Sequence, residues 1–291
     1  MGHKSGFVNI IGNPNVGKST IMNALVGEKL SIITSKAQTT RHRIMGIVNG
    51  EDFQIVYSDT PGVLKPNYQL QESMMKFVKN ALIDADILLY VTDVVENINK
   101  NKEFLDKIKK TSFPVILLLN KIDKSTEERT KELLNIWKTL LPNAQIIPIS
   151  ALESFNIDKL FDLIIELLPE APAYYPKTEL TDKTERFFVS EMIREQILIH
   201  YKKEIPYSVE VEVEEFKEDE NIIRIRSIIY VERQSQKGIV IGHQGKMLKK
   251  VGTEARKQME IFFNKKIYLE TFVKVNPDWR NKTIQLQKFG Y

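Results

Sequence analysis

Short apolar runs alternate with helical patterns along the first 168 residues of the chain. The apolar runs predict strands at Phe7–Ile11, Ile44–Val48, Phe53–Tyr57, Ile87–Val91, Val115–Leu119 and Ile146–Ile149. Helical patterns lie at Lys18–Leu25, Gln69–Leu82, Lys100–Lys110, Thr126–Leu140 and Ile157–Leu168. Asn49-Gly50 favours a tight hairpin turn, which makes the second and third strands antiparallel neighbours. Strands that alternate with helices predict a doubly wound α/β sheet, here with one antiparallel edge.

Prolines interrupt this alternation after Leu168, and the order of the elements then changes. We expect a first domain at 1–170, a linker at 171–185 and a second domain at 186–291. The second domain contains predicted helices at Arg186–Tyr201, Lys237–Ile241 and Lys246–Phe263, and predicted strands at Ser208–Phe216, Ile222–Val231 and Ile267–Val275. This order predicts a small α+β sandwich.

The composition excludes several classes of protein. The chain has 291 residues, of which 42% are hydrophobic, so a wholly disordered chain is excluded. The absence of cysteine excludes disulfides, thiolate zinc sites and thiol catalysis. No apolar run approaches the ~20 residues that span a bilayer, and Met1–Phe7 contains no hydrophobic signal core. We therefore expect a cytoplasmic protein without a transmembrane segment.

The net charge of +4 is unevenly distributed. Residues 231–291 carry thirteen basic and five acidic side chains, so this segment alone has a net charge of +8. A solvated basic face is one interpretation of this bias. A concentration of positive charge at one end of the chain also suits a polyanionic partner.

A phosphate-binding motif lies between the first predicted strand and the first predicted helix. The sequence GNPNVGKS matches G-x-x-x-x-G-K-[ST], in which glycines let backbone N–H groups close around phosphate oxygens. The Lys18 ammonium would reach the β- and γ-phosphates, and the Ser19 hydroxyl would bind Mg²⁺. We expect nucleotide contacts from the continuous run Gly12, Asn13, Pro14, Asn15, Val16, Gly17, Lys18, Ser19 and Thr20.

Asp59-Thr60-Pro61-Gly62 follows the second strand of the predicted hairpin. A carboxylate at the end of a strand can hold an Mg²⁺-bound water, and the Gly62 N–H can approach a γ-phosphate. Asp-x-x-Gly is also a common turn. The motif gains weight because its strand should lie beside the strand that carries the phosphate loop.

A guanine-recognition motif follows the strand at 115–119. The Asp123 carboxylate of Asn120-Lys121-Ile122-Asp123 can accept both the N1–H and the 2-amino group of guanine. Adenine has neither donor at these positions, so the acceptor would be left unpaired. Lys121 can lie along the base and Asn120 can tie the loops together, while a helix cap by Asp123 is the alternative interpretation. Ser150-Ala151-Leu152 follows the last strand, where the Ala151 N–H could reach guanine O6.

These motifs all lie at the carboxyl ends of predicted strands, where open α/β sheets bind ligands. Together they resemble the GTP-binding domain of translation-factor-related GTPases. That resemblance implies a mobile segment that supplies a threonine to Mg²⁺, and within Ser35–His42 we choose Thr40 over Thr39. A surface threonine without a role is the alternative.

Val63 stands where many small GTPases carry a glutamine that orients water, so we expect slow intrinsic hydrolysis. In related GTPases an asparagine at the position of Asn15 holds a potassium ion, and its use here is a hypothesis. The predicted catalytic residues are Lys18, Thr40, Asp59 and Gly62. The expected ligands are GTP or GDP, Mg²⁺ and this K⁺.

A Gly-x-x-Gly motif lies inside the basic segment. Gly242-His243-Gln244-Gly245 separates a short apolar piece from a lysine-rich helix. The motif and the order of elements resemble a type II KH domain, whose loop clamps a single-stranded RNA backbone beside an apolar groove. Val240 belongs to that expected groove. The other predicted RNA contacts are Arg233, Lys237, Ile239, Ile241, Gly242, His243, Gln244, Gly245, Lys246, Lys249 and Lys250.

A GTPase domain followed by a KH domain resembles the bacterial Era GTPases over almost the whole chain. The segments Gln38–His42, Glu204–Tyr207 and Trp279–Tyr291 add to the resemblance. It implies binding to the 3′ region of small-subunit (16S) ribosomal RNA and assistance to 30S subunit assembly, with peripheral membrane association. We expect a monomer.

Two alternative functions remain open from the sequence. One is a GTPase of RNA modification or large-subunit assembly with a protein-docking C-terminal module. The other is a membrane-associated signalling GTPase.

Overall fold

The computed structural model describes residues 2–98, 100 and 102–291, which divide into two compact units. The first unit contains residues up to 31, 40–66 and 71–182. The second contains residues 32–39, 67–70 and 183–291. Two short segments from the amino-terminal half therefore group with the carboxy-terminal part of the chain. The predicted boundaries at 170 and 186 stay a prediction.

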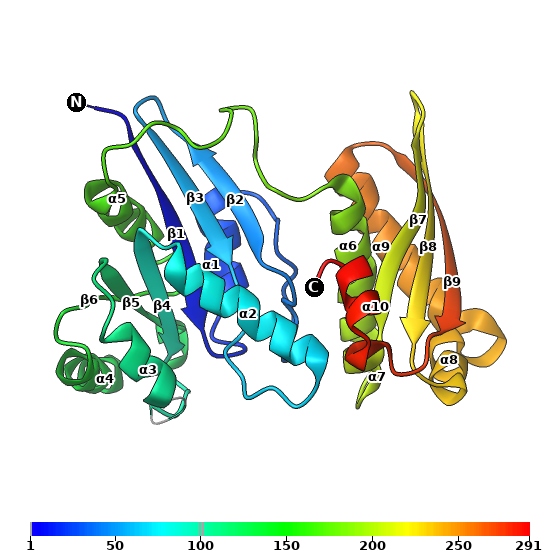
Figure 1. The fold of residues 1–291 in the computed structure, drawn as a ribbon, viewed down its shortest axis with the longest axis horizontal. Coiled ribbons are helices and arrows are strands. Elements are labelled where there is room, and N and C mark those ends of the chain that lie inside the picture. The colour runs from blue at the N-terminus through cyan, green and yellow to red at the C-terminus, as the bar shows by residue number, and fades with distance from the viewer. Residues whose placement is uncertain (1, 99, 101) are drawn as a thin grey trace. The chain divides into compact units, whose positions relative to one another are not determined.

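A six-stranded sheet forms the centre of the first unit, in the order β2-β3-β1-β4-β5-β6 (Figure 1). The strands are β1 (Lys4–Gly12), β2 (Ile44–Asn49), β3 (Phe53–Asp59), β4 (Ile87–Asp93), β5 (Val115–Asn120) and β6 (Gln145–Pro148). All neighbouring strands are parallel except β2 and β3. The expected doubly wound sheet with one antiparallel edge is confirmed.

Five helices belong mainly to this unit. They are α1 (Lys18–Val26), α2 (Gln69–Ile83), α3 (Lys102–Ile108), α4 (Glu127–Leu140) and α5 (Ile157–Leu167). The predicted helix at 100–110 corresponds to α3, and Asn101, within that prediction, lies outside the described residues. Gly27 ends α1 in the left-handed conformation, as its position after the apolar run predicts.

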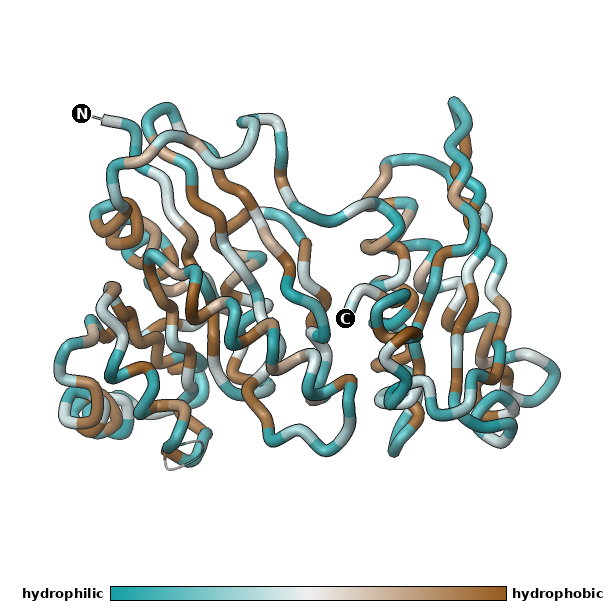
Figure 2. Tube along the Cα trace, viewed as in Figure 1, coloured by the Kyte–Doolittle hydropathy of each residue, from teal (hydrophilic) through white to brown (hydrophobic). Residues whose placement is uncertain are grey.

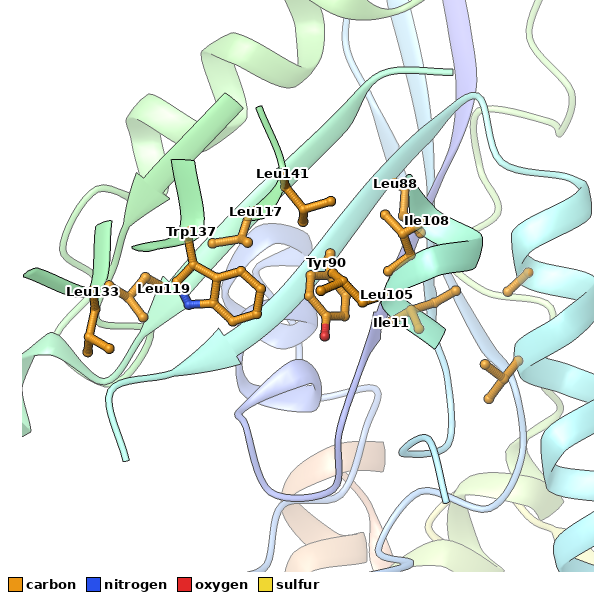
Figure 3. Close-up of a cluster of buried hydrophobic side chains, with 12 residues drawn as sticks. Ile11, Leu88, Tyr90, Leu105, Ile108, Leu117, Leu119, Leu133, Trp137 and Leu141 are labelled. Atoms are coloured by element: carbon orange, nitrogen blue, oxygen red, sulfur yellow. The ribbon is translucent and has the colours of Figure 1, made fainter. Parts of the chain in front are cut away.

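One buried hydrophobic cluster of the first unit lies between the sheet and helices α2, α3 and α4. Tyr90 of β4 packs edge-on against Trp137 of α4, with ring centroids 6.0 Å apart (Figure 3). Leu117 of β5 and Leu105 of α3 are buried in the same cluster. Burial of this apolar surface fixes the strands, and so fixes the loops at their carboxyl ends.

The hairpin between β2 and β3 turns later than Asn49-Gly50. Asn49 pairs with Gln54, and the Gly50 N–H donates to the Phe53 carbonyl, so the chain reverses over 51–52. A side chain at Gly50 would collide with the Phe53 ring at 2.1 Å. The glycine is therefore explained by packing against Phe53 rather than by the turn conformation.

The segment predicted as a linker lies along the β2–β3 edge. The Gln54 side chain accepts hydrogen bonds from the backbone N–H groups of Tyr174 and Tyr175. The Ile47 N–H donates to the Leu180 carbonyl at 2.8 Å. These bonds explain why residues up to Asp182 group with the first unit.

The second unit is a three-stranded sheet with helices. The strands are β7 (Glu210–Glu218), β8 (Ile222–Val231) and β9 (Lys266–Val275), and the helices are α6 (Glu185–His200), α7 (Ile205–Ser208), α8 (Gln234–Ile241), α9 (Lys246–Phe263) and α10 (Thr283–Lys288). β8 is central, antiparallel to β7 and parallel to β9. The predicted α+β order is confirmed, whereas α7 and α10 are short helices that the pattern did not predict.

Hydrophobic residues are concentrated along the strands of the sheets and alternate with polar residues along the helices (Figure 2). In the second unit Ile193 of α6, Ile229 of β8 and Met259 of α9 are fully buried. Trp279 is also fully buried, and its indole N–H donates to the Ser208 carbonyl at 3.0 Å. No helix in the part of the chain that the structure describes is both long and apolar enough to cross a bilayer.

Candidate nucleotide site and nucleic-acid interface

The phosphate loop connects β1 to α1, as its sequence predicts. Gly12 pairs with Val91 of β4, and a Cβ at Gly12 would lie 2.2 Å from the Val91 carbonyl oxygen. Gly17 has a φ of 101°, and a Cβ there would lie 2.2 Å from the Asn120 amide nitrogen. Both glycines are therefore required by close approach, and Gly17 also by its backbone conformation.

Lys18 is buried at the start of α1 and donates to the Asn13 carbonyl at 2.9 Å. Burial lowers the pKa of Lys18 to about 8, although the carboxylates of Asp59 and Glu96 favour the charged form. A buried ammonium whose charged form is disfavoured by desolvation is suited to an anionic ligand, because phosphate oxygens would stabilise its protonated form.

The side chains of Ser19, Thr40 and Asp59 converge beside the phosphate loop. The Ser19 hydroxyl donates to the Asp59 carboxylate at 2.7 Å and lies 2.9 Å from the Thr40 hydroxyl. Asp59 is fully buried, and its Oδ1 has no hydrogen-bond partner among the residues that the structure describes. Burial raises the pKa of Asp59, against the influence of Lys18 and of the neighbouring hydroxyls.

These three groups fit a magnesium ion. Mg²⁺ prefers oxygen ligands and usually binds through one or two carboxylates together with substrate phosphates. The unpartnered Asp59 Oδ1 is a buried acceptor whose charge such an ion would compensate. The Thr39 hydroxyl is instead hydrogen-bonded to the Thr34 hydroxyl and to the Lys36 carbonyl. The geometry therefore favours Thr40, as chosen from the sequence.

Gly62 lies directly against the phosphate loop. A Cβ at Gly62 would lie 2.7 Å from Pro14, and the next residue, Val63, donates its N–H to the Gly12 carbonyl at 3.0 Å. Thr60 donates its hydroxyl to the Ile10 carbonyl at 2.7 Å. The Asp59–Gly62 segment is thus fixed to β1 and its loop, with no side chain at Gly62 to obstruct a phosphate.

Asn120 ties three loops together, as predicted. Its amide nitrogen donates to the Val16 carbonyl at 2.8 Å, and its amide oxygen accepts the Ala151 N–H at 3.1 Å. The Ala151 N–H is therefore paired with Asn120 in this structure, and its contact with guanine O6 stays a prediction. Leu152 is exposed next to it.

The Asp123 carboxylate is oriented by Ser150, whose hydroxyl donates to it at 2.6 Å. Asp123 is exposed, so it becomes a buried acceptor only when a base covers it. It is not the cap of α4, because Thr126 occupies that position and accepts the Arg129 N–H. The alternative interpretation of Asp123 as a helix cap is therefore wrong.

Sequence reasoning missed two acidic residues around these loops. Asp93, at the end of β4, pairs with the Lys121 ammonium at 2.6 Å and holds that side chain in place. Glu96 interacts with the Asn13 side chain, and burial raises its pKa. Asp93 ends a parallel strand at the ligand edge of the sheet, and this position is the signal that could have identified it.

The expected mobile segment is packed at its carboxyl end. Arg41 is fully buried, and His42 is 9% exposed. Arg43 pairs with Asp84 at 2.5 Å and also contacts the side chains of Asn9 and Ser58. Polar side chains therefore form a network at this end of the segment and directly after it, and the mobility of Ser35–His42 stays a prediction.

The Gly-x-x-Gly motif forms an exposed turn between α8 and α9. Gly242, Gln244 and Gly245 all have positive φ values, of 71°, 52° and 74°. A Cβ at Gly242 would lie 2.8 Å from Met247, whereas Gly245 faces open space. His243 and Gln244 are exposed. The backbone at this turn can therefore be approached closely by a ligand.

Basic side chains surround this turn. Lys246, Lys249 and Lys250 are exposed on the first turns of α9, where the helix contributes further positive potential. Arg233 is exposed just before α8, and Lys237 is partly exposed within it. The predicted cationic residues are therefore exposed or partly exposed on the two helices that flank the turn and directly before α8.

One of the three residues expected to line an apolar groove is not available to a ligand. Ile239 is 50% exposed and Ile241 is partly exposed, so both can contact a ligand. Val240 is fully buried instead, and its carbonyl accepts the Tyr201 hydroxyl at 2.6 Å. The expectation that Val240 lines the groove is wrong, because successive residues of a helix point in different directions.

Comparisons with known proteins agree with both parts of the chain. A family model described as "50S ribosome-binding GTPase" matches residues 7–121. A second family model, described as "KH domain", matches residues 204–280. These ranges include the phosphate loop and the Gly-x-x-Gly turn respectively.

Relatives match over nearly the full length. The GTPase Era proteins of Staphylococcus epidermidis and Staphylococcus haemolyticus are each 45% identical over 291 residues, covering 99% of this chain and 97% of each relative. A crystal structure of Era with MgGDPNP and nucleotides 1506–1542 of 16S ribosomal RNA has a TM-score of 0.95 and 37% identity, covering 99% of both chains. An Aquifex aeolicus Era variant bound to GDP·AlF₄⁻ has the same TM-score, 38% identity and the same coverage. This chain belongs to the Era GTPase family.

Proposed function

We propose that this protein is a GTP-hydrolysing switch that binds the 3′ region of small-subunit ribosomal RNA and assists 30S subunit assembly. The convergence of Ser19, Thr40 and Asp59 beside the phosphate loop carries the GTPase part of the proposal. A solved Era complex contains both MgGDPNP and 16S ribosomal RNA, which supports extending both ligands to this family member.

The phosphate chain of GTP would be held by the backbone of the Gly12–Ser19 loop and by the Lys18 ammonium. Ser19, Thr40 and Asp59 would hold Mg²⁺, which supplies positive charge that offsets the developing charge on the phosphate oxygens when it is bound. The Gly62 N–H would lie at the γ-phosphate. Lys18→Ala should abolish GTP binding or turnover, measured by fluorescent-nucleotide titration and phosphate release.

Guanine selection would depend on Asp123, held by the Ser150 hydroxyl. Lys121, fixed by Asp93, would lie along the base. Asn120 would act indirectly, since both ends of its amide are used to join the loops. Asp123 and Lys121 therefore contact the base, and Asn120 sets the distance between their loop and the phosphate loop.

The water-orienting group for hydrolysis is not Val63, whose side chain has no hydrogen-bonding atom. We propose slow intrinsic turnover, with a potassium ion at Asn15 as the accelerating charge. Comparing phosphate release in K⁺ and in Na⁺ at equal ionic strength tests this role. Equal rates in the two salts would end the potassium proposal without affecting GTP binding.

RNA would bind at the exposed turn between α8 and α9. Phosphates would approach the backbone of Gly242–Gly245 and the lysines of α9, and bases would contact Ile239 and Ile241. Gel-shift titration with 3′-end fragments of 16S ribosomal RNA, in GTP analogue and in GDP, tests both RNA binding and its dependence on nucleotide. If none of the fragments binds at moderate salt, the proposal that this turn binds ribosomal RNA is refuted.

The alternatives predict other outcomes of the same measurements. A protein-docking C-terminal module would give no RNA crosslinks in cells. A lipid-binding signalling GTPase would float with anionic liposomes and ignore the RNA fragments. The cytoplasm as compartment, peripheral contact with the inner face of the cell membrane and the monomeric state all remain proposals.

A further inference from the structure

A buried ion pair in α6 lies against the segment that precedes Thr40. Arg194 and Glu191 are 1% and 4% exposed respectively. The guanidinium bonds to the Glu191 carboxylate side-on, with Nε 2.7 Å from one oxygen and Nη2 2.6 Å from the other. This geometry fixes the plane of the guanidinium and leaves its other N–H groups directed away from Glu191.

The remaining donors of Arg194 bind backbone carbonyls of residues 32–39. Nη2 donates to the Thr39 carbonyl, and Nη1 donates to the Gln38 carbonyl at 3.4 Å. Gln38 has a φ of 57°, which a residue other than glycine adopts only where its surroundings hold it. Arg194 and residues 32–39 belong to the same compact unit.

The same segment is held at three further points of that unit, one of which is the Ile33 N–H, which donates to the Glu195 carboxylate at 3.2 Å. The Lys36 ammonium donates to the carbonyls of Leu198 and Tyr201, at the carboxyl end of α6, where carbonyls have no partner within the helix. The Gln38 side chain accepts the Tyr68 hydroxyl at 3.0 Å. The backbone of residues 36–39 is therefore anchored both at the end of α6 and at Arg194.

The Thr39 carbonyl and the Thr40 N–H belong to one planar peptide group. A hydrogen bond that orients the carbonyl therefore also orients the bond from nitrogen to the Thr40 Cα. Thr40 itself belongs to the first unit, where its hydroxyl meets Ser19 and Asp59. The change from one compact unit to the other thus occurs within a single peptide group.

Helix stabilisation alone does not account for this pair. Pairs three residues apart contribute a few tenths of a kcal/mol to a helix and do so on its surface. Burial adds a desolvation cost, so a buried pair is weak support for stability. The contacts that remain unexplained by helix stability are those to the Gln38 and Thr39 carbonyls.

We propose that Arg194, held by Glu191, is a positioning residue that orients the Thr39–Thr40 peptide and so sets the Thr40 hydroxyl for Mg²⁺ in the GTP state. The inference rests on the proposed function, because it takes Thr40 as a magnesium ligand. GTPase switch segments are ordered by contacts with the γ-phosphate and Mg²⁺ and are released after hydrolysis. Loss of Arg194 should therefore weaken GTP-analogue binding and spare GDP binding.

The test uses the full chain with both members of the pair replaced, Glu191→Met with Arg194→Met. Replacing a buried ion pair by apolar residues of similar volume usually preserves the fold, whereas removing one member leaves a buried charge. The matched control is Arg256→Met with Glu260→Met, since that pair is also within one helix of this unit, at 2.5 Å. Circular dichroism melting establishes that both double variants fold.

The affinity for a non-hydrolysable GTP analogue in Mg²⁺ should fall about tenfold in the first variant, as expected when a hydrogen bond to a charged donor is lost. GDP affinity should change by less than about twofold, since the GDP state does not use Thr40. The control variant should match the wild-type protein for both nucleotides. Equal losses for analogue and GDP would show a merely structural role and overturn the proposal.

Thr40→Ala separates failure of this inference from failure of the proposed function. If Thr40→Ala leaves the Mg²⁺-dependent affinity for the analogue unchanged, the magnesium assignment of Thr40 is wrong, and the inference falls with it. If Thr40→Ala weakens binding but the methionine pair does not, only the role of Arg194 is wrong. In the expected result the two effects are not additive, because both act through the same hydroxyl.

Discussion

Lys18 should take up a proton when the nucleotide binds. Burial holds its pKa at about 8 in the structure, compared with 10.5 for an ordinary lysine. That depression corresponds to about 3 kcal/mol disfavouring the charged form. Phosphate oxygens around the ammonium would reverse it, so that the bound lysine is fully protonated over the neutral range.

The size of the effect follows from the pKa. At pH 8 about half of the Lys18 side chains are neutral before binding, so GTP binding should take up about 0.5 proton. At pH 7 the uptake should be about 0.1 proton, since most Lys18 side chains are already charged. The affinity for GTP should therefore be insensitive to pH well below 8 and should weaken as the pH rises through 8.

Isothermal titration calorimetry in buffers of different ionisation enthalpy measures this uptake directly. Glu96→Gln removes a carboxylate that favours charged Lys18, so its uptake at pH 8 should exceed that of the wild-type protein. Glu103→Gln, on the exposed first turn of α3, is the matched control and should leave the uptake unchanged. Zero uptake at pH 8 would refute the argument that burial holds Lys18 partly neutral.

Three further changes test other parts of the molecule. Asp123→Asn should lower GTP affinity by about tenfold to a hundredfold and shift preference toward xanthosine triphosphate, measured by competition binding, because one charged acceptor is lost; unchanged guanine preference would contradict its role. Gly245→Asp adds negative charge where a side chain meets open space, so gel shifts should show weaker RNA binding while GTP affinity stays constant; undiminished RNA binding would count against this turn. Trp279→Ala should lower the free energy of unfolding by about 3–5 kcal/mol in denaturant titration, since Trp279 is fully buried; a loss below 1 kcal/mol would contradict the packing argument.

The fold could be predicted because each strand of the first unit is a continuous apolar run and each connection carries its own signal. Gly17 was located by the spacing of its motif. Asp59 was located by its motif and by its place at the end of a predicted strand, since parallel strands bring their carboxyl ends to one edge of the sheet. Physical requirements that are local in sequence, such as a left-handed glycine or a helix cap, are visible in sequence.

Contacts between distant segments could not be predicted in this way. The pairing of Asp93 with Lys121 joins two strands and depends on side-chain rotamers. The hydrogen bond from the Ala151 N–H to the Asn120 side chain forms because two loops approach each other closely. The burial of Val240 depends on the rotation of α8, which a helix of eight residues with a weak apolar face does not specify.

The grouping of residues 32–39 with the second unit also escaped prediction. This grouping depends on hydrogen bonds to backbone carbonyls. Lys36 donates to the carbonyls at the carboxyl end of α6, and Arg194 donates to carbonyls of the segment itself. Backbone carbonyls are present in every residue, so the sequence does not indicate which of them accept these bonds. Three charged residues at core-facing positions of α6, Glu191, Arg194 and Glu195, could have suggested that this helix has a second task.

Positively charged side chains gather at the amino end of α9, where the helix dipole is also positive. Its first turn contains no acidic residue, and three lysines follow within five positions. In the free protein these cations repel one another and the helix dipole alike. Simple multivalent anions should relieve that repulsion, so sulfate or phosphate buffers would raise the melting temperature of this part of the molecule and would also compete with RNA for it.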